Sequence, residues 1–199
     1  VMSAMVRHPA LLAVEVATTL RSHPDRLIPG IGLGVPAWMR QMGLHPASPL
    51  RAVRECVEVV RALLAGETVT SGPDAVFQCD EISLEYPVDR PVPIHIGVVG
   101  PKMLAMSGRV ADGTILSVGA GIEYLDVARR HVDDGRAAAG RTDGHRITQF
   151  AITAVDDDGA AARAAAARTL AMYTFAGGRN AITEAAGISD EVESIAAEG

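Results

Sequence analysis

Apolar side chains recur at helical spacing between Ser48 and Gly66 more clearly than anywhere else in the chain. They stand three or four positions apart, with arginine and glutamate between them: Leu50, Val53, Val57, Val60 and Leu64. That spacing places them on one face of a helix. Ser48 suits the residue before the first turn, Pro49 the first helical position and Gly66 the position just past the end. The pattern therefore predicts an amphipathic helix that begins at Pro49 and ends shortly before Gly66.

Weaker helical patterns and short apolar runs cover most of the remaining chain. Helices are expected over residues 9–21, 100–111, 122–139, 158–175, 179–186 and 189–197. Apolar runs without clean alternation predict buried strands over residues 26–32, 92–97, 113–119 and 146–155. Residues 67–90 are β-branched and contain a Ser-Gly-Pro-Asp turn, so they are expected to form an excursion, either a hairpin or an extended loop.

Alternating strands and helices indicate right-handed parallel β-α-β units and an α/β fold. Strands without polar alternation are typical of a sheet that is covered on both faces. Two architectures fit this order of elements. A closed eight-stranded barrel needs about 250 residues, so 199 residues with four predicted strands would hold only about its second half. A doubly wound open sheet would fit within the whole chain.

Composition excludes several classes of function. The chain is 48% hydrophobic and 21% charged, with a formal net charge of −6, which disfavours a nucleic-acid partner. No apolar run approaches the roughly 20 residues that span a bilayer, and no secretory leader is recognisable. Cys56 and Cys79 form no CxxC pair, so we expect reduced thiols in a cytoplasmic protein. The chain opens at Val1 and its last residues show no closing strand, so we expect a piece of something longer.

The stretch "PGIGLGVPAW", residues 29–38, places three glycines at alternate positions after a predicted strand. It does not make the GxGxxG dinucleotide fingerprint, because Val35 occupies the place of the third glycine and no helix is expected directly after it. One interpretation is a tight turn. The other is that bare backbone N–H groups approach a phosphate or a flat ring, because parallel α/β folds bind ligands at the carboxyl ends of their strands.

A second strand followed by glycine and a helix start occurs in "GVVGPKMLAM", residues 97–106, with Lys102 in the first helical turn. Helix starts carry unpaired N–H donors and a partial positive charge, which attract anions. The alternative is that Lys102 is simply solvated. His95 lies within a predicted strand and is expected to be an interior side chain rather than a ligand. His8 lies at a junction between strand and helix, and the histidines show no metal-binding spacing.

Three blocks together resemble the luciferase-like monooxygenase superfamily, and within it the deazaflavin-using methylenetetrahydromethanopterin reductase type. The resemblance covers roughly residues 5–155 and rests on "RHPALLAVEVATTL", "RLIPGIGLG" and "PVPIHIGVVGPKMLAMSGRVADGTILS". It implies a TIM-type (β/α)8 barrel of which the C-terminal half to two-thirds is present. Residues 1–199 would then be a single partial-barrel domain, with residues 67–90 as an insertion.

The resemblance also implies a cofactor and a place for it. Members bind coenzyme F420 or FMN at the carboxyl ends of the strands and pass a hydride to or from a small organic substrate. The backbone that holds the cofactor phosphate maps onto residues 32–35, with part of 97–102 beside it: Gly32, Leu33, Gly34, Val35, Gly97, Gly100, Pro101 and Lys102. No metal is expected, and no catalytic residue is assigned, because the family's residues near the reactive ring precede this part of the barrel.

The leading hypothesis is therefore an F420-dependent oxidoreductase. An FMN-dependent monooxygenase of the same superfamily is the first alternative. A truncated barrel paralogue without catalytic activity is the second. The resemblance further implies a cytoplasmic homodimer that forms through outer helices and has no membrane or nucleic-acid partner.

Overall fold

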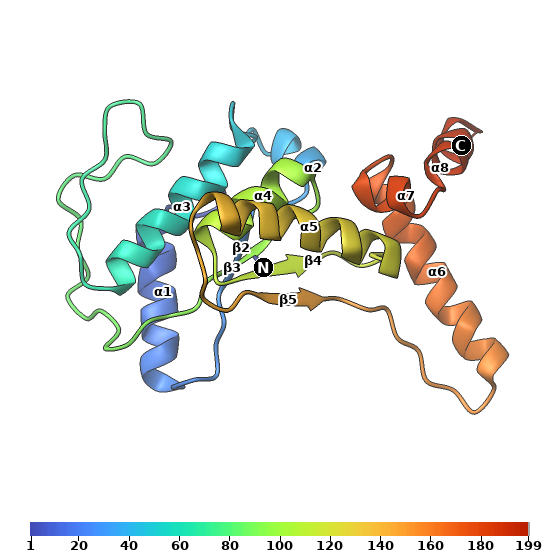
Figure 1. The fold of residues 1–199 in the computed structure, drawn as a ribbon, viewed down its shortest axis with the longest axis horizontal. Helices are drawn as coiled ribbons and strands as arrows, with labels where there is room; N and C mark the ends of the chain where they lie inside the picture. The colour runs from blue at the N-terminus through green and yellow to red at the C-terminus, as the bar shows by residue number, and fades with distance from the viewer. Residues whose placement is uncertain (199) are drawn as a thin grey trace.

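Five parallel strands form one sheet at the centre of the protein (Figure 1). In this computed structural model, which describes residues 1–198, the strands are β1 (Met2–Ser3), β2 (Gly30–Gly32), β3 (His95–Gly97), β4 (Gly113–Leu116) and β5 (Arg146–Gln149). They lie side by side in chain order. Four of them fall within the predicted strands, and the fifth, β1, was not predicted. The predicted strands were too long, because the ladder of hydrogen bonds covers only three or four residues of β2 to β5.

The predicted helices are confirmed, most of them within two residues of their ends. Five lie between the strands: α1 (Pro9–Ser22), α2 (Pro36–Gln41), α3 (Pro49–Leu64), α4 (Pro101–Val110) and α5 (Ile122–Ala138). Three follow β5: α6 (Gly159–Gly177), α7 (Ala181–Ala185) and α8 (Ser189–Glu198). Gly66 ends α3 with a φ of +84°, as its position after the apolar series predicts. The prediction that no helix follows the glycine-rich stretch was wrong, because α2 begins at Pro36.

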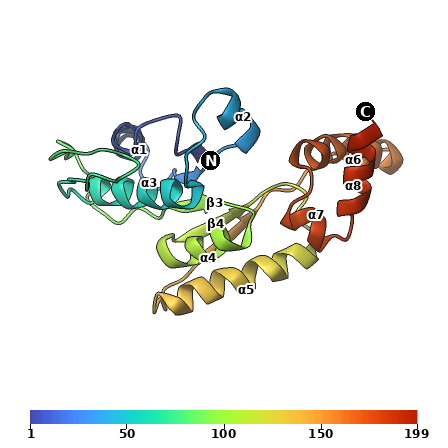
Figure 2. The same ribbon diagram turned by 90° about the horizontal axis from the view of Figure 1, so that it is seen from above.

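The strand order decides between the two architectures. A doubly wound sheet reverses its winding at a switch point and carries helices on both faces. Here every strand pairs with its neighbours in sequence, so successive right-handed crossovers place their helices on the same face. Figure 2 shows α4 and α5 along one side of β3 and β4, and α3 packs against α4. The sheet is therefore a barrel wall of five strands, and the doubly wound alternative is excluded.

The two faces of the sheet differ in side-chain size. Ile31, Ile96 and Leu116 point toward the helices and are fully buried. The opposite, inner face carries glycines in several strands, and their neighbours fill the space. A Cβ added to Gly97 would lie 2.9 Å from Cγ1 of Val1, for example. The strands lack polar alternation because of these glycines, and not because helices cover both faces.

Glycines also set the distance between α4 and α5. A Cβ atom on Gly108 would overlap the carbonyl oxygen of Val132, and one on Gly135 would overlap that of Ala105. The two backbones therefore touch where the helices cross. This close contact holds the outer layer against β3 and β4.

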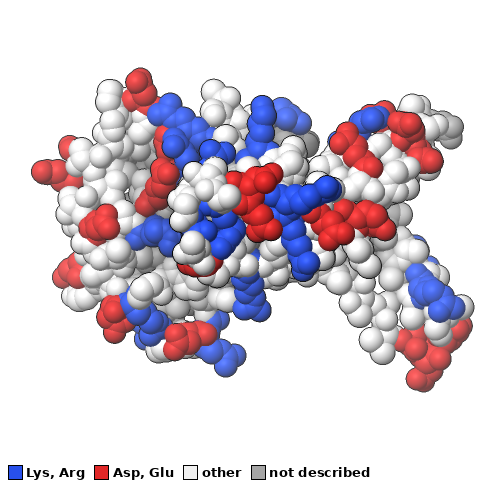
Figure 3. All heavy atoms as spheres, viewed as in Figure 1, with Lys and Arg blue, Asp and Glu red and all other residues white. Residues whose placement is uncertain are grey.

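The excursion is an extended loop closed by one antiparallel bridge, between Val69 and Ile82. It runs beside α3, where Glu55 accepts a hydrogen bond of 2.7 Å from the amide of Val76. At the other end of the molecule, α6, α7 and α8 extend away from the sheet (Figure 1). Acidic and basic side chains are interspersed over the face in Figure 3. No helix among the described residues is long and apolar enough to cross a membrane.

Candidate functional site

The carboxyl edge of the sheet brings the two glycine-rich loops together. Gly32 pairs with Gly97 at the ends of β2 and β3, so residues 33–35 lie next to residues 98–100. Each loop leads directly into a helix, α2 from the first and α4 from the second. This neighbourhood was predicted from the assumption that both strands end at the same edge.

The first loop leaves two successive amides without a partner. Among residues 1–198, no hydrogen bond uses the N–H groups of Gly34 or Val35. The Leu33 carbonyl, by contrast, accepts a bond of 2.8 Å from Oγ of Ser3. Gly34 is exposed and has a φ of +93°, a conformation that favours glycine. Val35 is 39% exposed. The loop therefore presents donors that nothing in the described chain uses.

The second loop has the same arrangement. Gly100 precedes α4 with extended dihedrals, φ −77° and ψ 154°, and no side chain caps the helix. Within the described part of the chain, the N–H groups of Val99, Gly100 and Lys102 have no acceptor. The Val99 carbonyl accepts a bond of 2.5 Å from the hydroxyl of Tyr124. Burial raises the pKa of Tyr124 to about 12, so this hydroxyl is a neutral donor.

The predicted site residues differ in how open they are. Gly34, Val35, Pro101 and Lys102 are exposed, whereas the other four are partly or fully buried: Gly32, Leu33, Gly97 and Gly100. Gly32 is the most enclosed, because it is buried whereas Leu33, Gly97 and Gly100 are only partly buried. Two hollows of about 310 and 300 Å³ lie elsewhere, the first between residues 20–24 and 87–90 and the second within residues 179–190. The candidate site is an open edge rather than a closed pocket.

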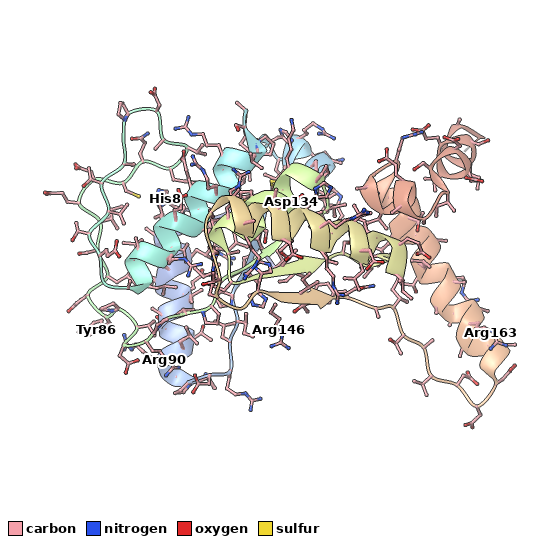
Figure 4. The ribbon with its side chains drawn as sticks, viewed as in Figure 1. His8, Tyr86, Arg90, Asp134, Arg146 and Arg163 are labelled. Carbon is pink, nitrogen blue, oxygen red and sulfur yellow. The ribbon has the colours of Figure 1, made fainter. Side chains whose placement is uncertain are left out.

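Two histidines have roles that the structure explains. The ring of His8 caps α1, because its Nδ1 accepts a bond of 3.2 Å from the amide of Ala10. Its Nε2 must then carry the hydrogen that it donates to the carbonyl of Gln78, 3.1 Å away. Figure 4 shows His8 beside the excursion. The prediction that His95 is an interior side chain is confirmed, since it is only 4% exposed.

His95 lies on the inner face of the sheet, one row below the glycine pair. A Cβ added to Gly113, its neighbour on β4, would lie 2.6 Å from Nε2 of His95, so the ring lies over that glycine. Arg146 of β5 continues the same row (Figure 4). Burial and, secondarily, the charge of Arg146 lower the pKa of His95. The row therefore favours a neutral imidazole in the interior of the barrel wall.

The amino edge of the sheet is built differently. Asp112, just before β4, accepts bonds of 2.8 Å from the amide of Ile94 and from Arg61, and pairs with Arg141 at 3.2 Å. Burial opposes the charge of Asp112, but these donors outweigh it and lower the pKa of the carboxyl group. The network connects α3, the residues just before β3 and β4, and the loop between α5 and β5. In barrels, this edge contributes to stability, whereas ligands bind at the carboxyl edge.

A comparison with known proteins identifies the family of this chain. The model of the luciferase-like monooxygenase family matches residues 1–198, which is nearly the whole chain. The chain belongs to the luciferase-like monooxygenase family. This confirms the resemblance that the three sequence blocks indicated.

Relatives in sequence are longer than this luciferase-like chain. It is 30% identical over 184 residues to a 5,10-methylenetetrahydromethanopterin reductase of Archaeoglobus fulgidus, a match that covers 92% of the chain and 54% of that protein. It is 33% identical over 139 residues to an F420-dependent glucose-6-phosphate dehydrogenase of Microbacterium testaceum, which covers 68% and 41%. The chain thus spans about half the length of these relatives.

Solved structures show the same fold. A coenzyme F420-dependent tetrahydromethanopterin reductase from Methanopyrus kandleri superposes with a TM-score of 0.83 at 24% identity, over 96% of this chain and 59% of that one. Monooxygenase RslO1 from Streptomyces bottropensis gives a TM-score of 0.70 at 19% identity, over 98% and 59%. At these identities the comparison concerns the fold alone, and it agrees with a partial luciferase-like barrel.

Sequence reasoning missed two side chains at the site of this luciferase-like chain, Ser3 and Tyr124. Each touches a loop 25 or more positions away along the chain, so no local pattern connects them. It also missed α2, although Pro36, two positions after the last glycine, is a signal of a helix start.

Proposed function

We propose that this chain carries the phosphate-binding part of an F420-dependent oxidoreductase, which transfers a hydride between the deazaflavin and a small organic substrate. The observation that carries the proposal is a pair of adjacent loops at the carboxyl edge of the sheet, each with amides that nothing in residues 1–198 pairs. The names of the sequence relatives support it, since the dehydrogenases are F420-dependent and the reductase acts on a pterin.

The residues present fit an anionic phosphate group. Unpartnered N–H donors on glycine-containing loops accept an anion without competition from side chains, and the start of α4 adds a partial positive charge. The exposed Lys102 lies in the first turn of that helix. The residues proposed to hold the phosphate side of the cofactor are Gly32, Leu33, Gly34, Val35, Gly97, Gly100, Pro101 and Lys102.

Coenzyme F420, when bound, supplies the hydride chemistry through its deazaflavin ring. The part of the chain proposed here is binding and orientation: backbone donors fix the phosphate, and the inner face of the sheet lies below it. In that face, His95 lies one row beneath the glycine pair and favours the neutral imidazole. No residue of this chain is proposed as an acid or a base in the reaction.

FMN is the alternative cofactor, because the family model is that of monooxygenases and because the barrel of RslO1 has the same fold. Both cofactors carry a phosphate on a ribityl-type chain, so the loops suit either. A titration distinguishes them. The purified protein, with its helix content checked by circular dichroism, is titrated with F420 and with FMN in a calorimeter.

Tighter binding of F420 supports the proposal, and tighter binding of FMN supports a flavin-dependent monooxygenase. If neither cofactor binds at millimolar concentration, the cofactor role is wrong and the non-catalytic paralogue is the better description. The same proposal includes a single partial-barrel domain, a homodimer and a cytoplasmic location. The free thiols of Cys56 and Cys79 support a reducing compartment, and light scattering tests the dimer.

A further inference from the structure

We propose that Ser3 and Tyr124 are positioning residues that aim the amides of Gly34 and Gly100 at the cofactor phosphate. The inference rests on the proposed function, and it deepens it by naming what orients the donors. Neither residue was predicted from the sequence. Both come from other elements, Ser3 from β1 and Tyr124 from the first turn of α5.

The hydroxyl of Ser3 has one hydrogen to give and gives it to the loop. Its Oγ lies 2.8 Å from the Leu33 carbonyl oxygen and 3.3 Å from the amide nitrogen of Met5. Because the Met5 amide can only donate, Oγ accepts there and its own hydrogen points to Leu33. The sulfur of Met39, 3.6 Å away, is a much weaker acceptor.

This bond fixes the direction of the next amide. The Leu33–Gly34 peptide is trans, so its carbonyl and its N–H point in opposite directions. With the Leu33 carbonyl turned toward Ser3, the N–H of Gly34 points away from it. That N–H has no acceptor within the described residues, and Gly34 is exposed. The donor is therefore held outward.

Tyr124 does the same for the second loop. Its hydroxyl donates to the Val99 carbonyl at 2.5 Å, and the residue is only 1% exposed, so the donor is held in place by its surroundings. The Val99–Gly100 peptide is also trans, and the N–H of Gly100 is left pointing away from Tyr124. The two neighbouring loops thus share one arrangement. In each, a hydroxyl donates a hydrogen bond to a loop carbonyl, and the amide of the glycine that follows has no acceptor within the described residues.

These hydrogen bonds matter because the backbone of a glycine-containing loop is flexible. Gly34 has a φ of +93°, and without a side chain the peptide before it can rotate at little cost. Such a rotation would exchange the N–H for a carbonyl oxygen and turn attraction for an anion into repulsion. A hydroxyl that only satisfied a buried carbonyl would stabilise the fold, but it would not discriminate between ligands with and without a phosphate.

The test compares each cofactor with its phosphate-free form: F420 with its ribityl deazaflavin, and FMN with riboflavin. The measured quantity is the ratio of the Kd without phosphate to the Kd with phosphate, for whichever cofactor binds more tightly. Ser3→Ala and Tyr124→Phe should each lower this ratio about tenfold, the effect of one misdirected hydrogen bond to a charged group. The Kd of the phosphate-free form should stay as in the wild type.

Ser3→Thr keeps the hydroxyl and should restore the ratio. Thr19→Val is the matched control, because it removes a bond of 2.8 Å from a hydroxyl to the Glu15 carbonyl on α1, away from the loops, and should leave the ratio unchanged. An unchanged ratio in both Ser3→Ala and Tyr124→Phe would overturn the inference while the proposed function stood. A wild-type ratio near one would overturn the phosphate role and the inference with it. Should Tyr124→Phe not fold, the two Ser3 variants decide.

Discussion

Gly34 combines two constraints that a side chain would violate. Its φ of +93° is strained for any other residue, and a Cβ would lie 3.1 Å from Cε of Met39. We expect Gly34→Ala to lower the free energy of unfolding by about 1–2 kcal/mol and to weaken cofactor binding at the same time. Urea denaturation measures the first effect and calorimetry the second.

Gly72→Ala is the control for that variant. Its Cβ would meet nothing within 4 Å, and its φ lies outside the left-handed region. It should leave stability unchanged or slightly higher, because alanine restricts the unfolded chain. Equal stability of the Gly34 and Gly72 variants would show that the loop before α2 adapts freely.

Asp112 joins the elements that meet at the amino edge of the sheet. Replacing it by asparagine removes its charge from two arginines and alters the acceptor of the Ile94 amide. Because the network is partly exposed to solvent, we expect the free energy of unfolding to fall by about 1–2 kcal/mol, less than for a fully buried ion pair. Chemical denaturation measures it. Asp126→Asn on α5, an exposed carboxylate outside any ion pair of the described residues, should cost nothing measurable.

Cofactor binding by the Asp112→Asn variant is the second readout. Asp112 precedes β4, whereas the glycine loops follow β2 and β3, at the other edge. The Kd should therefore remain that of the wild type as long as the variant is folded. A large change in Kd without loss of stability would contradict the division of the two edges.

Elements with many periodic positions were predictable, and short ones were not. The helix α3 has five apolar positions in series and a marked start and end, so its bounds follow from the sequence. The helix α2 has six residues, and β1 has two, which is too few to show a period. Residues 151–155 continue the apolar pattern of β5 but pair with no strand of the described chain. A single sequence does not show which segments will pair.

The candidate site divides in the same way. Both loops could be recognised because glycine and proline mark them locally, and the parallel fold places them at one edge. Ser3 and Tyr124 could not, since their contacts span 30 and 25 positions. A backbone binding site can thus be recognised in a sequence by the glycines that leave its amides uncovered. The distant side chains that orient those amides cannot be recognised in the same way.

The crossing of α4 and α5 carries a prediction about elements. Gly108→Ala and Gly135→Ala would each drive a methyl group into a carbonyl of the other helix. The helices must then separate. We therefore expect the free energy of unfolding to fall by about 1–3 kcal/mol, although alanine has a better helix propensity than glycine. Asp134→Ala, next to Gly135 on the exposed side of α5 (Figure 4), is the control and should be neutral. Thermal denaturation compares the three, and neutral glycine variants would mean that the helices pack loosely.

Under the proposed function, the molecule as a whole separates binding from stability along the strand direction. Its carboxyl edge exposes donors that nothing in residues 1–198 pairs, whereas its amino edge satisfies a carboxylate with three donors. Five strands make up part of the eight in a complete barrel, and the relatives are nearly twice as long. The chain therefore supplies one wall, with a helical layer outside and glycines inside.

The same wall contains two histidines whose titration bears on the stability of the whole chain. Burial, followed by nearby arginines, lowers the pKa values of His95 and His145. Nε2 of His145 lies 2.8 Å from Oγ1 of Thr114, inside the helical layer. In the unfolded chain these two imidazoles take up protons near pH 6.5, whereas in the folded chain they do so only at lower pH. Stability is therefore full above about pH 6.5 and decreases as the pH falls below it.

Urea denaturation at pH 7.5 and at pH 5.5 should show this decrease, at most about 1.4 kcal/mol per pH unit for each histidine. The window lies above the range in which Asp112 and Asp143 take up protons, so the carboxylates do not obscure it. His95→Gln and His145→Gln should each reduce the difference between the two pH values, even if they lower stability at both. His45→Gln, in an exposed loop, should leave the difference as it is. A difference that persists in both interior variants would place the pH dependence of folding outside the barrel wall.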